Sequence, residues 1–247
     1  MLITSKQNNI IKYANSIKEA KYIKKYGECL VESEKVVKEL VAKNLVSTIL
    51  VEENKVDKYD SILKNFTGKA YLINDSVSNY LSESITSSGI FGFVKIQENR
   101  EVVGNKILVL DNLQDPSNLG AIIRSAMAFD FKSIIMLNGA YPYTPKVIRS
   151  SMSYVFDINI ISMNTIQLVD FLNKNHYNLV CADMSGEELK MYKKPDKSAL
   201  VIGNEGNGVS DEIMRLANSV VRIPMSNGVE SLNAGVSASI IMYKLGE

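Results

Sequence analysis

The chain has 247 residues, 46% of them hydrophobic and 22% charged, with a formal net charge of +1. This length lies near the upper limit for one hydrophobic core and therefore favours two domains. The two cysteines, Cys29 and Cys181, are too few and too far apart for a disulfide framework or a thiolate metal site, so both should be reduced core residues. The single histidine, His176, lies at a predicted helix end, which favours a surface or capping role over catalysis and argues against His-rich metal sites and His-dependent nucleophiles.

The opening residues lack an apolar signal segment, and no apolar run approaches the roughly 18 residues that span a bilayer. We therefore expect a soluble, cytoplasmic protein without membrane contacts. The charge is unevenly distributed, because residues 1–26 contain six lysines and a single acid, Glu19. A basic end of this kind suits an anionic partner.

Residues 7–26 are predicted to form one amphipathic helix, because Ile10, Ala14 and Ile17 recur at helical spacing. The outward face combines basic and aromatic side chains, which suit the phosphates and unstacked bases of RNA. A solvated lysine face is the simpler alternative. The side chains concerned are Lys18, Lys21, Lys25, Tyr22 and Tyr26.

Alternating strand-like and helix-like segments divide the chain into two α/β domains. In the first, residues 1–97, strands are expected at 28–33, 47–53, 69–75 and 89–97, with helices near 33–43, 56–65 and 75–83. A polar linker, 98–105, follows. In the second, residues 106–247, the apolar segments KILVL, SIIML, VFDINII, YNLVCA, ALVIG and VVRIPM predict a parallel sheet buried on both faces, with helices at 118–130, 144–150, 164–175, 210–217 and 231–245.

Two strand-to-helix turns of the second domain carry residues of chemical interest. In DNLQDPSNLGAIIR, Ser117 or Asn118 can cap the following helix. Arg124 lies inside that helix and suits either phosphate binding or a surface salt bridge. In GNEGNGVSDE, three glycines permit close approach of a ligand, but neither the dinucleotide nor the Walker spacing is present. Glu205 in this turn disfavours a phosphate and favours a cationic or neutral ligand.

A third turn lies in IPMSNGVESLNAGVSASIIMYKL, residues 223–245. It predicts a short strand, a polar loop and a helix whose first turn carries Ser231 and Asn233. Such a turn at the edge of a parallel sheet is a usual place for a small-molecule site, so we expect a cofactor there. The inner helix face is made of alanine, glycine and serine, which predicts very close packing against a neighbouring element.

Together, in order and at matching spacing, the three turns resemble the motifs of the SpoU, or TrmH, branch of the knotted SPOUT RNA methyltransferases. The resemblance covers Lys106 to Glu247, and residues 1–97 resemble more loosely the small ribosomal-protein-like substrate-binding domain of this group. It implies S-adenosylmethionine-dependent methylation of a ribose 2′-hydroxyl in structured RNA, without a metal. It also implies a deep C-terminal trefoil knot and a homodimer formed through the C-terminal domain.

The resemblance also assigns residues. It implies catalytic roles for Asn118, Arg124, Glu205, Ser231 and Asn233, cofactor binding by Gly203, Ile223 and Leu232, and an RNA-facing position for Arg149. We add Lys18, Lys21 and Lys25 as candidate RNA contacts. The chain departs from the family pattern at Ser33 and Ser153, where glycine is typical, and at Asn159, where proline is common.

The resemblance favours ribosomal RNA, of the large subunit, as the substrate; a transfer RNA methyltransferase and a non-catalytic RNA-binding protein of the same fold are the alternatives. A nucleotide-binding metabolic enzyme of unrelated fold is disfavoured by the basic N-terminus and by the missing phosphate loops. Because a guanidinium is a poor base, our hypothesis is that Arg124 holds the target phosphate and lowers the pKa of the 2′-hydroxyl. Ser231 and Asn233 would then orient the ribose and the cofactor.

Overall fold

The computed structural model describes residues 2–97, 101–226 and 229–246. The chain forms two compact units, Met1–Glu98 with Tyr143–Ile148, and Asn99–Pro142 with Arg149–Glu247. The segment 143–148, which the sequence placed in the second domain, thus groups with the first unit. Of the predicted linker, residues 98–100 lie outside the described residues, and 101–105 precede the first strand of the second unit.

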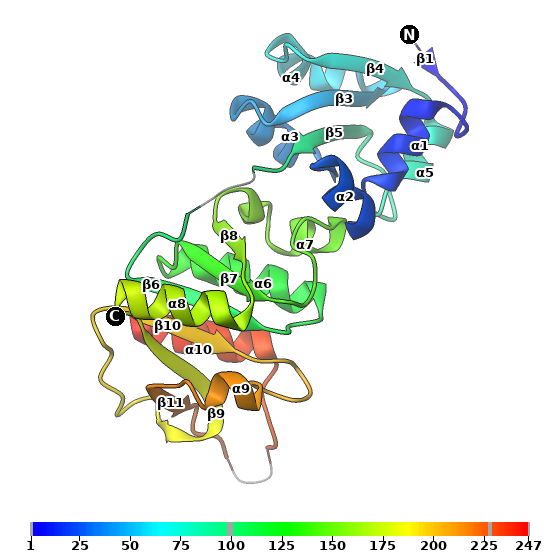
Figure 1. The fold of residues 1–247 in the computed structure, drawn as a ribbon. Helices are drawn as coiled ribbons and strands as arrows, with labels where there is room; N and C mark the ends of the chain where they lie inside the picture. Colours follow the sequence, from blue (N-terminus) through cyan, green and yellow to red (C-terminus); the bar gives the residue numbers. More distant parts are fainter. Residues whose placement is uncertain (1, 98–100, 227–228, 247) are drawn as a thin grey trace. The chain divides into compact units, whose positions relative to one another are not determined.

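The first unit is built on a mixed five-stranded sheet in the order β1-β4-β3-β5-β2 (Figure 1). Strands β1, β4 and β3 run parallel, whereas β5 pairs antiparallel with both β3 and β2. The strands are β1 (Leu2–Ile3), β2 (Glu28–Glu32), β3 (Val46–Glu52), β4 (Lys69–Ile73) and β5 (Ile90–Lys95), and the helices are α1 (Asn9–Ser16), α2 (Ala20–Tyr26), α3 (Glu34–Ala42), α4 (Asp60–Lys64) and α5 (Asp75–Leu81).

The single helix predicted over 7–26 is wrong, because the structure has two helices, α1 and α2, with a break at residues 17–19. The buried Ile17 explains the break. Its carbonyl accepts a hydrogen bond from the backbone N–H of Leu30 in β2, at 3.1 Å, instead of from the next helical turn. A tertiary hydrogen bond thus overrides the helical pattern. Gly27, with φ 65°, ends α2 in the left-handed conformation that glycine adopts without strain.

Two of the departures from the family pattern lie at backbone positions that favour glycine. Ser33, before α3, has φ 114°, and Ser153 has φ 64°. A side chain in this region of φ is uncommon, which gives a physical reason for the glycine typical of both sites. The third departure, Asn159, is the first residue of β8 and has ordinary strand geometry.

The second unit contains a six-stranded sheet in the order β11-β9-β10-β6-β7-β8, in which every neighbouring pair is parallel, as predicted. The strands are β6 (Lys106–Asp111), β7 (Ser133–Leu137), β8 (Asn159–Ser162), β9 (Asn178–Glu188), β10 (Ser198–Ile202) and β11 (Ser219–Arg222). The helices are α6 (Pro116–Ala128), α8 (Thr165–Asn175), α9 (Asp211–Met214) and α10 (Ala234–Gly246). Helix α7 (Pro145–Ser150) begins in the segment that groups with the first unit, and its last two residues group with the second.

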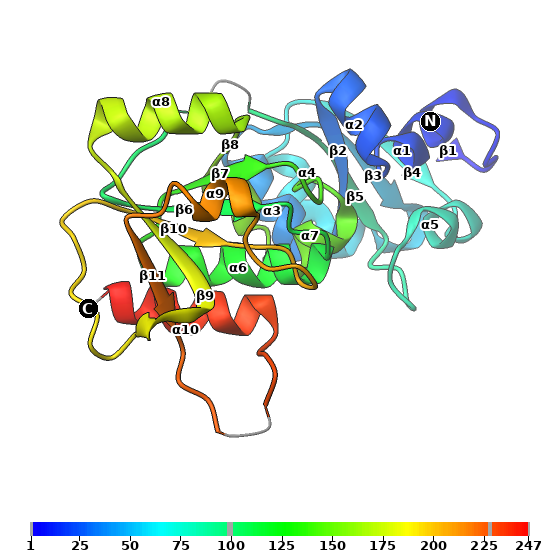
Figure 2. The ribbon, with the colours of Figure 1, turned by 60° about the horizontal axis from the view of Figure 1, so that its bottom comes forward.

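Helices cover both faces of this sheet (Figure 2). On one face, Leu168 and Leu172 of α8 and Ile213 of α9 belong to a buried apolar cluster with alternate residues of the strands. Helices α6 and α10 lie side by side on the other face. Strand order reverses between β6 and β10, and the crevice at the carboxyl ends of such strands is the usual ligand site of a parallel sheet.

The close packing expected for the small-residue helix is present between α10 and α6. A β-carbon at Gly235 would lie 3.3 Å from the β-carbon of Ala121, and the hydroxyls of Ser125 and Ser239 are 2.7 Å apart. The backbones of the two helices can approach in this way only because both carry small residues at the contact. Helix α10 is thereby held beside the turn that begins α6.

The ends of two helices differ from the prediction. Helix α6 begins at Pro116, and its cap is the carboxylate of Asp115 rather than Ser117 or Asn118. Helix α10 begins at Ala234, so Ser231 and Asn233 precede it instead of lying in its first turn. As expected, His176 is a C-terminal cap, of α8, with φ 59°.

Both cysteines are buried and free, also as expected. Burial raises the pKa of the Cys181 thiol to about 12. Across the described residues, the helices are too short or too polar for any to cross a bilayer.

Candidate active site

A chain of side-chain hydrogen bonds joins the three turns at the carboxyl edge of the second sheet. The side-chain amide of Asn118, at the start of α6, donates to Oε1 of Glu205 at 3.0 Å. The amide of Asn233 donates in turn to Oδ1 of Asn118 at 2.8 Å. Residues separated by 87 and 115 positions in the sequence are thus directly bonded. We call the set Glu205, Asn118 and Asn233 the amide relay.

The orientation of each amide in the relay follows from its partners. Glu205 can only accept while ionised, so the NH2 group of Asn118 faces it and its oxygen faces Asn233. The oxygen of Asn233 then accepts from the backbone N–H groups of Gly235 and Val236, at 2.9 and 3.2 Å, and caps α10. The side chains of Asn118 and Asn233 each donate through the NH2 group and accept through the oxygen. Replacing either amide by a carboxylate would therefore remove a donor.

Glu205 is held ionised by the turn that precedes α6. Desolvation alone would raise its pKa, but the hydrogen bond from Asn118 and those from the backbone N–H groups of Gln114 and Asp115 together hold the pKa of Glu205 below its usual value. The two backbone bonds measure 3.0 and 2.8 Å. The carboxylate that seemed out of place in a glycine-rich turn therefore binds protein N–H groups, and joins the second turn to the first.

The turn after β10 has a closed backbone. Asn204 and Gly208 exchange two backbone hydrogen bonds, each of 2.9 Å. A β-carbon at Gly203 would lie 2.1 Å from the carbonyl carbon of Gly208, so only glycine fits there. At its far end the backbone N–H of Ser210 donates to the buried carboxylate of Asp111, in β6, at 2.7 Å. Ser210 precedes α9 and makes no side-chain cap.

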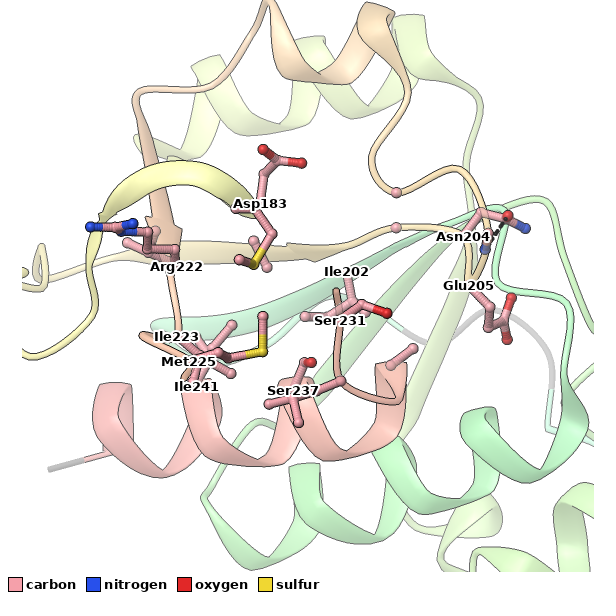
Figure 3. Close-up of a pocket in the computed structure, with 18 residues that line it drawn as sticks. Asp183, Ile202, Asn204, Glu205, Arg222, Ile223, Met225, Ser231, Ser237 and Ile241 are labelled. Atoms are coloured by element: carbon pink, nitrogen blue, oxygen red, sulfur yellow. Dashed lines mark hydrogen bonds between the residues drawn. The ribbon is translucent and has the colours of Figure 1, made fainter. Parts of the chain in front are cut away.

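A cavity of about 240 Å³ lies between this turn, the ends of β9 and β11, and α10. Figure 3 shows Ile223, Met225 and Ile241 gathered on one side of it, and Ser231 and Ser237 near the middle. Arg222 and Glu205 lie at opposite ends. The lining is thus largely apolar, with a few hydroxyls, two carboxylates, those of Asp183 and Glu205, and one guanidinium, that of Arg222, which is the composition of a site for a mostly apolar ligand with a few polar groups.

A second, open cavity of about 680 Å³ adjoins the first, and Glu205, Ser231, Leu232 and Ala234 line both. The relay residues Asn118 and Asn233 also line it. The described residues around it include two carboxylates, those of Asp115 and Glu205, and no cationic side chain. A neutral hydroxyl-bearing group fits such a cavity better than a phosphate does.

The structure brings together most of the predicted site residues. Gly203, Ile223, Leu232 and Ser231 line the first cavity. Arg124 does not join them: it lies exposed on α6 and lines neither cavity. Parts of the third turn, residues 227 and 228, lie outside the described residues.

The predicted RNA contacts belong to both units, with the three lysines in the first and Arg149 in the second. Arg149 is exposed in the last turn of α7, and Lys21 and Lys25 are exposed on α2. Lys18 is largely covered, because its ammonium group binds the carboxylate of Glu83 at 3.0 Å and the carbonyl of Leu81 at 3.3 Å. It is the one member of this predicted set that makes a salt bridge within the described residues.

Several contributors to the site were missing from the sequence analysis. Asp115 caps α6, Asp111 holds the second turn, and Asp183 and Met225 line the cavity. The Asp-Pro pair at 115 and 116 is a signal for the cap that could have been used. For Asp183 and Met225 no local pattern exists, because they meet only through the strand order. The part of the chain that the structure describes contains no cluster of three or more His, Cys, Asp or Glu suited to a metal ion.

Comparison with known proteins places this geometry in context. The chain is 28% identical over 247 residues to the 23S rRNA (guanosine(2553)-2′-O)-methyltransferase RlmP of Bacillus subtilis, with 98% of each chain covered. The fold matches the crystal structure of an AdoMet-bound rRNA methyltransferase from Sinorhizobium meliloti with a TM-score of 0.88, at 22% identity, over 99% of this chain and 97% of the other. It also matches the SpoU methyltransferase AviRb of Streptomyces viridochromogenes in complex with AdoMet, with a TM-score of 0.87, at 23% identity, over 97% of each chain.

The model of the SpoU rRNA Methylase family matches residues 105–243. This range contains both cavities, the amide relay and all three turns. The chain therefore belongs to the SpoU rRNA Methylase family.

Proposed function

We propose that the protein is an S-adenosylmethionine-dependent methyltransferase that methylates a ribose 2′-hydroxyl in ribosomal RNA of the large subunit. The amide relay carries this proposal, because it joins the three turns beside the two adjoining cavities in a chain of this family. The choice of RNA is supported by the similarity to RlmP over nearly the whole of both chains. Residues 106–247 form the catalytic domain and residues 1–97 the substrate-binding domain in this proposal.

The residues around the first cavity fit S-adenosylmethionine. Aliphatic and thioether side chains suit an adenine ring, backbone groups of the 203–208 turn suit its polar edge, and the Asp183 carboxylate suits a cationic ligand with hydroxyls. Gly203, Ile223 and Leu232 would hold the cofactor mainly through backbone atoms. When bound, the cofactor would supply a methyl group activated by its positively charged sulfur, which becomes a neutral thioether once the methyl group has been transferred.

The second cavity is the proposed position of the target ribose. Its acidic lining favours a neutral sugar over a phosphate, and Ser231 borders both cavities, where it can orient the 2′-hydroxyl toward the cofactor. Holding two reactants in line can contribute several kcal/mol, up to about 7–11 in model systems. Asn118, Glu205 and Asn233 act by holding the turns in place. Arg124 holds the adjacent phosphate and lowers the pKa of the hydroxyl; Arg149, Lys18, Lys21 and Lys25 are the other proposed RNA contacts.

We also propose that the C-terminal segment forms a deep trefoil knot. The segment that leads into α10 approaches the turn after β6 and the turn after β10, because Asn233 is bonded to Asn118, and Asn118 to Glu205. Helix α10 then packs on α6 through its smallest residues. Such low bulk is what a helix needs when it passes close to other segments of its own chain.

A homodimer through the C-terminal domain completes the proposal. The outward face of α10 exposes Val236, Ile240 and Tyr243, at spacings of four and three, and Met127 of the neighbouring α6 is also exposed. Exposed apolar side chains at helical spacing suit a self-complementary interface. Arg124 lies on α6 and lines neither cavity. In the proposed homodimer it contacts RNA that is bound at the site of the second subunit.

Calorimetry with S-adenosylmethionine tests the cofactor site. Ser237 points into the first cavity from α10 (Figure 3), and Ser237→Leu fills that space, so we expect at least a tenfold loss of affinity. Ser162→Leu, at the end of β8 and outside both cavities, is the matched control and should bind normally. Failure of the unaltered protein to bind S-adenosylmethionine would contradict the proposal and favour a non-catalytic RNA-binding role.

Asn118→Asp tests the amide relay. It removes the donor to Glu205 and places a second carboxylate beside it, at a cost of about 1.5–3 kcal/mol for a hydrogen bond to a charged group. We expect methyl transfer to fall roughly ten- to a hundredfold, measured with radiolabelled cofactor on ribosomal RNA. Ser117→Asp adds the same charge one residue away, at an exposed position, and should change the rate less than about threefold. Equal rates for the two variants would show that the relay has no part in the site.

Arg124→Lys tests the proposed phosphate contact. The substitution keeps the positive charge but loses the planar, two-pronged donor set of the guanidinium. RNA affinity should therefore be retained within about threefold while turnover falls at least tenfold. Arg124→Ala should weaken both. Full activity of the lysine variant in single-turnover assays would refute the role assigned to the guanidinium.

Sedimentation velocity tests the homodimer. Ile240→Asp places a charge in the exposed apolar face of α10, and in a two-fold interface this charge is introduced twice, so we expect dissociation to monomers. Ile166→Asp, at a still more exposed position on α8, is the control and should leave the dimer intact. An unaltered protein that sediments as a monomer would rule out this interface.

A further inference from the structure

A line of aromatic rings runs from the core of the first unit to its surface. Phe93 is buried in β5, and its ring centroid lies 5.6 Å from that of Tyr13 on α1. The ring of Tyr13 lies 5.2 Å from Tyr26, and that of Tyr26 lies 6.3 Å from Tyr22, both on α2. The last two ring planes are within 10° of parallel, and Tyr26 is 43% exposed.

Polar contacts hold the inner part of this line in place. The hydroxyl of Tyr13 donates to Glu28 at 2.8 Å, and the hydroxyl of Ser47 donates to the other oxygen of the same carboxylate at 2.7 Å. Desolvation, together with this hydrogen bond, raises the pKa of Tyr13 above its ordinary value, so the donor is present throughout the neutral range. Tyr26 thus rests on a ring that cannot turn freely, which lowers the entropy lost when a ligand binds.

Lysine side chains lie beside the last two rings of the line, of which Tyr26 is exposed and Tyr22 is half-buried. The ammonium group of Lys21 lies 5.5 Å from the ring centroid of Tyr22, and that of Lys25 lies 5.1 Å from that of Tyr26. Both lysines are exposed, whereas Lys18 is engaged with Glu83. We call the set Tyr22, Tyr26, Lys21 and Lys25 the tyrosine surface. The two rings continue a line that begins in the core, whereas the two lysines are exposed to solvent. A lysine face that only contacts solvent would not need rings packed in this way.

We propose that the tyrosine surface binds unpaired nucleotides of the RNA substrate, with bases stacked on the two rings and phosphates held by the two lysines. The inference rests on the proposed function and names the part of the substrate that the first unit recognises. Near-parallel rings suit consecutive bases, which are themselves near parallel. Base stacking on aromatic side chains requires an exposed base face, which a single strand offers and a duplex does not.

Fluorescence anisotropy with the full chain tests this inference, using labelled oligouridylate and a blunt RNA duplex of equal length. Tyr22→Leu/Tyr26→Leu should weaken single-strand binding roughly tenfold or more, because stacking on each ring contributes to affinity, and duplex binding less than about twofold. Lys21→Ala/Lys25→Ala should weaken both RNAs and flatten the salt dependence of single-strand binding by about 1.4 in log–log slope. The single variant Tyr22→Leu alters only the last, half-buried ring of the line and provides the same test if the double variant has a lowered melting temperature.

Matched controls are available in the same unit. Tyr80 on α5 is 40% exposed and carries a lysine, Lys6, 5.2 Å from its ring centroid, so Tyr80→Leu removes a similar exposed pair elsewhere. Lys58 lies 4.9 Å from the ring centroid of Tyr59, which is fully buried, so Lys58→Ala removes a cation from a ring that no base can reach. Neither control should change single-strand affinity by more than about twofold. Equal losses for single strand and duplex in the Tyr22→Leu variants, no loss, or the same loss in Tyr80→Leu would overturn the proposal.

Measurement of methyl transfer on the same samples separates this inference from the proposed function. Transfer to ribosomal RNA with tyrosine variants that bind single strands normally would refute the tyrosine surface alone. Tyrosine-dependent single-strand binding without any transfer would refute the proposed reaction and leave the surface standing. An unaltered protein that binds no RNA would overturn both.

Discussion

The site depends above all on the hydrogen bonds of Asn118. This one buried amide meets the carboxylate of the second turn and the amide that caps the last helix. An ionised carboxylate can only accept hydrogen bonds, and the backbone N–H groups at a helix N-terminus can only donate them. Each amide side chain of the relay can therefore be oriented in only one way. Three turns that belong to distant parts of the sequence are thereby brought to one edge of the sheet, beside the two cavities.

Much of the second unit could be predicted from its sequence. Its strands are short apolar runs buried on both faces, and their parallel order follows from alternation with helices. The errors lie where long-range contacts decide local structure. Ile17 gives its carbonyl to Leu30 and so divides a helix. The cap of α6 is a different case, because Asp115 binds residues next to it in the sequence and the Asp-Pro signal was overlooked. Segment 143–148 carries no local signal of the unit it joins.

The candidate site was predictable in its residues but not in its bonds. Motif resemblance selected Asn118, Glu205 and Asn233, whereas only coordinates show that each binds the next. Glu205 illustrates the gap: from the sequence its charge favoured a cationic or neutral ligand over a phosphate, and only the structure shows that its oxygens bind backbone N–H groups of the neighbouring turn. Asp183 and Met225 escaped notice because strand order alone places them beside the cavity.

The position of α10 has a thermodynamic consequence. This helix supplies one wall of the first cavity and, through its capping residue Asn233, one end of the relay. Local unfolding of α10 therefore removes the ligand site. A ligand bound at the site must raise the free energy of that unfolding by the free energy with which it binds. Exchange of the amide protons of the C-terminal helix with solvent should accordingly slow when the cavity is occupied.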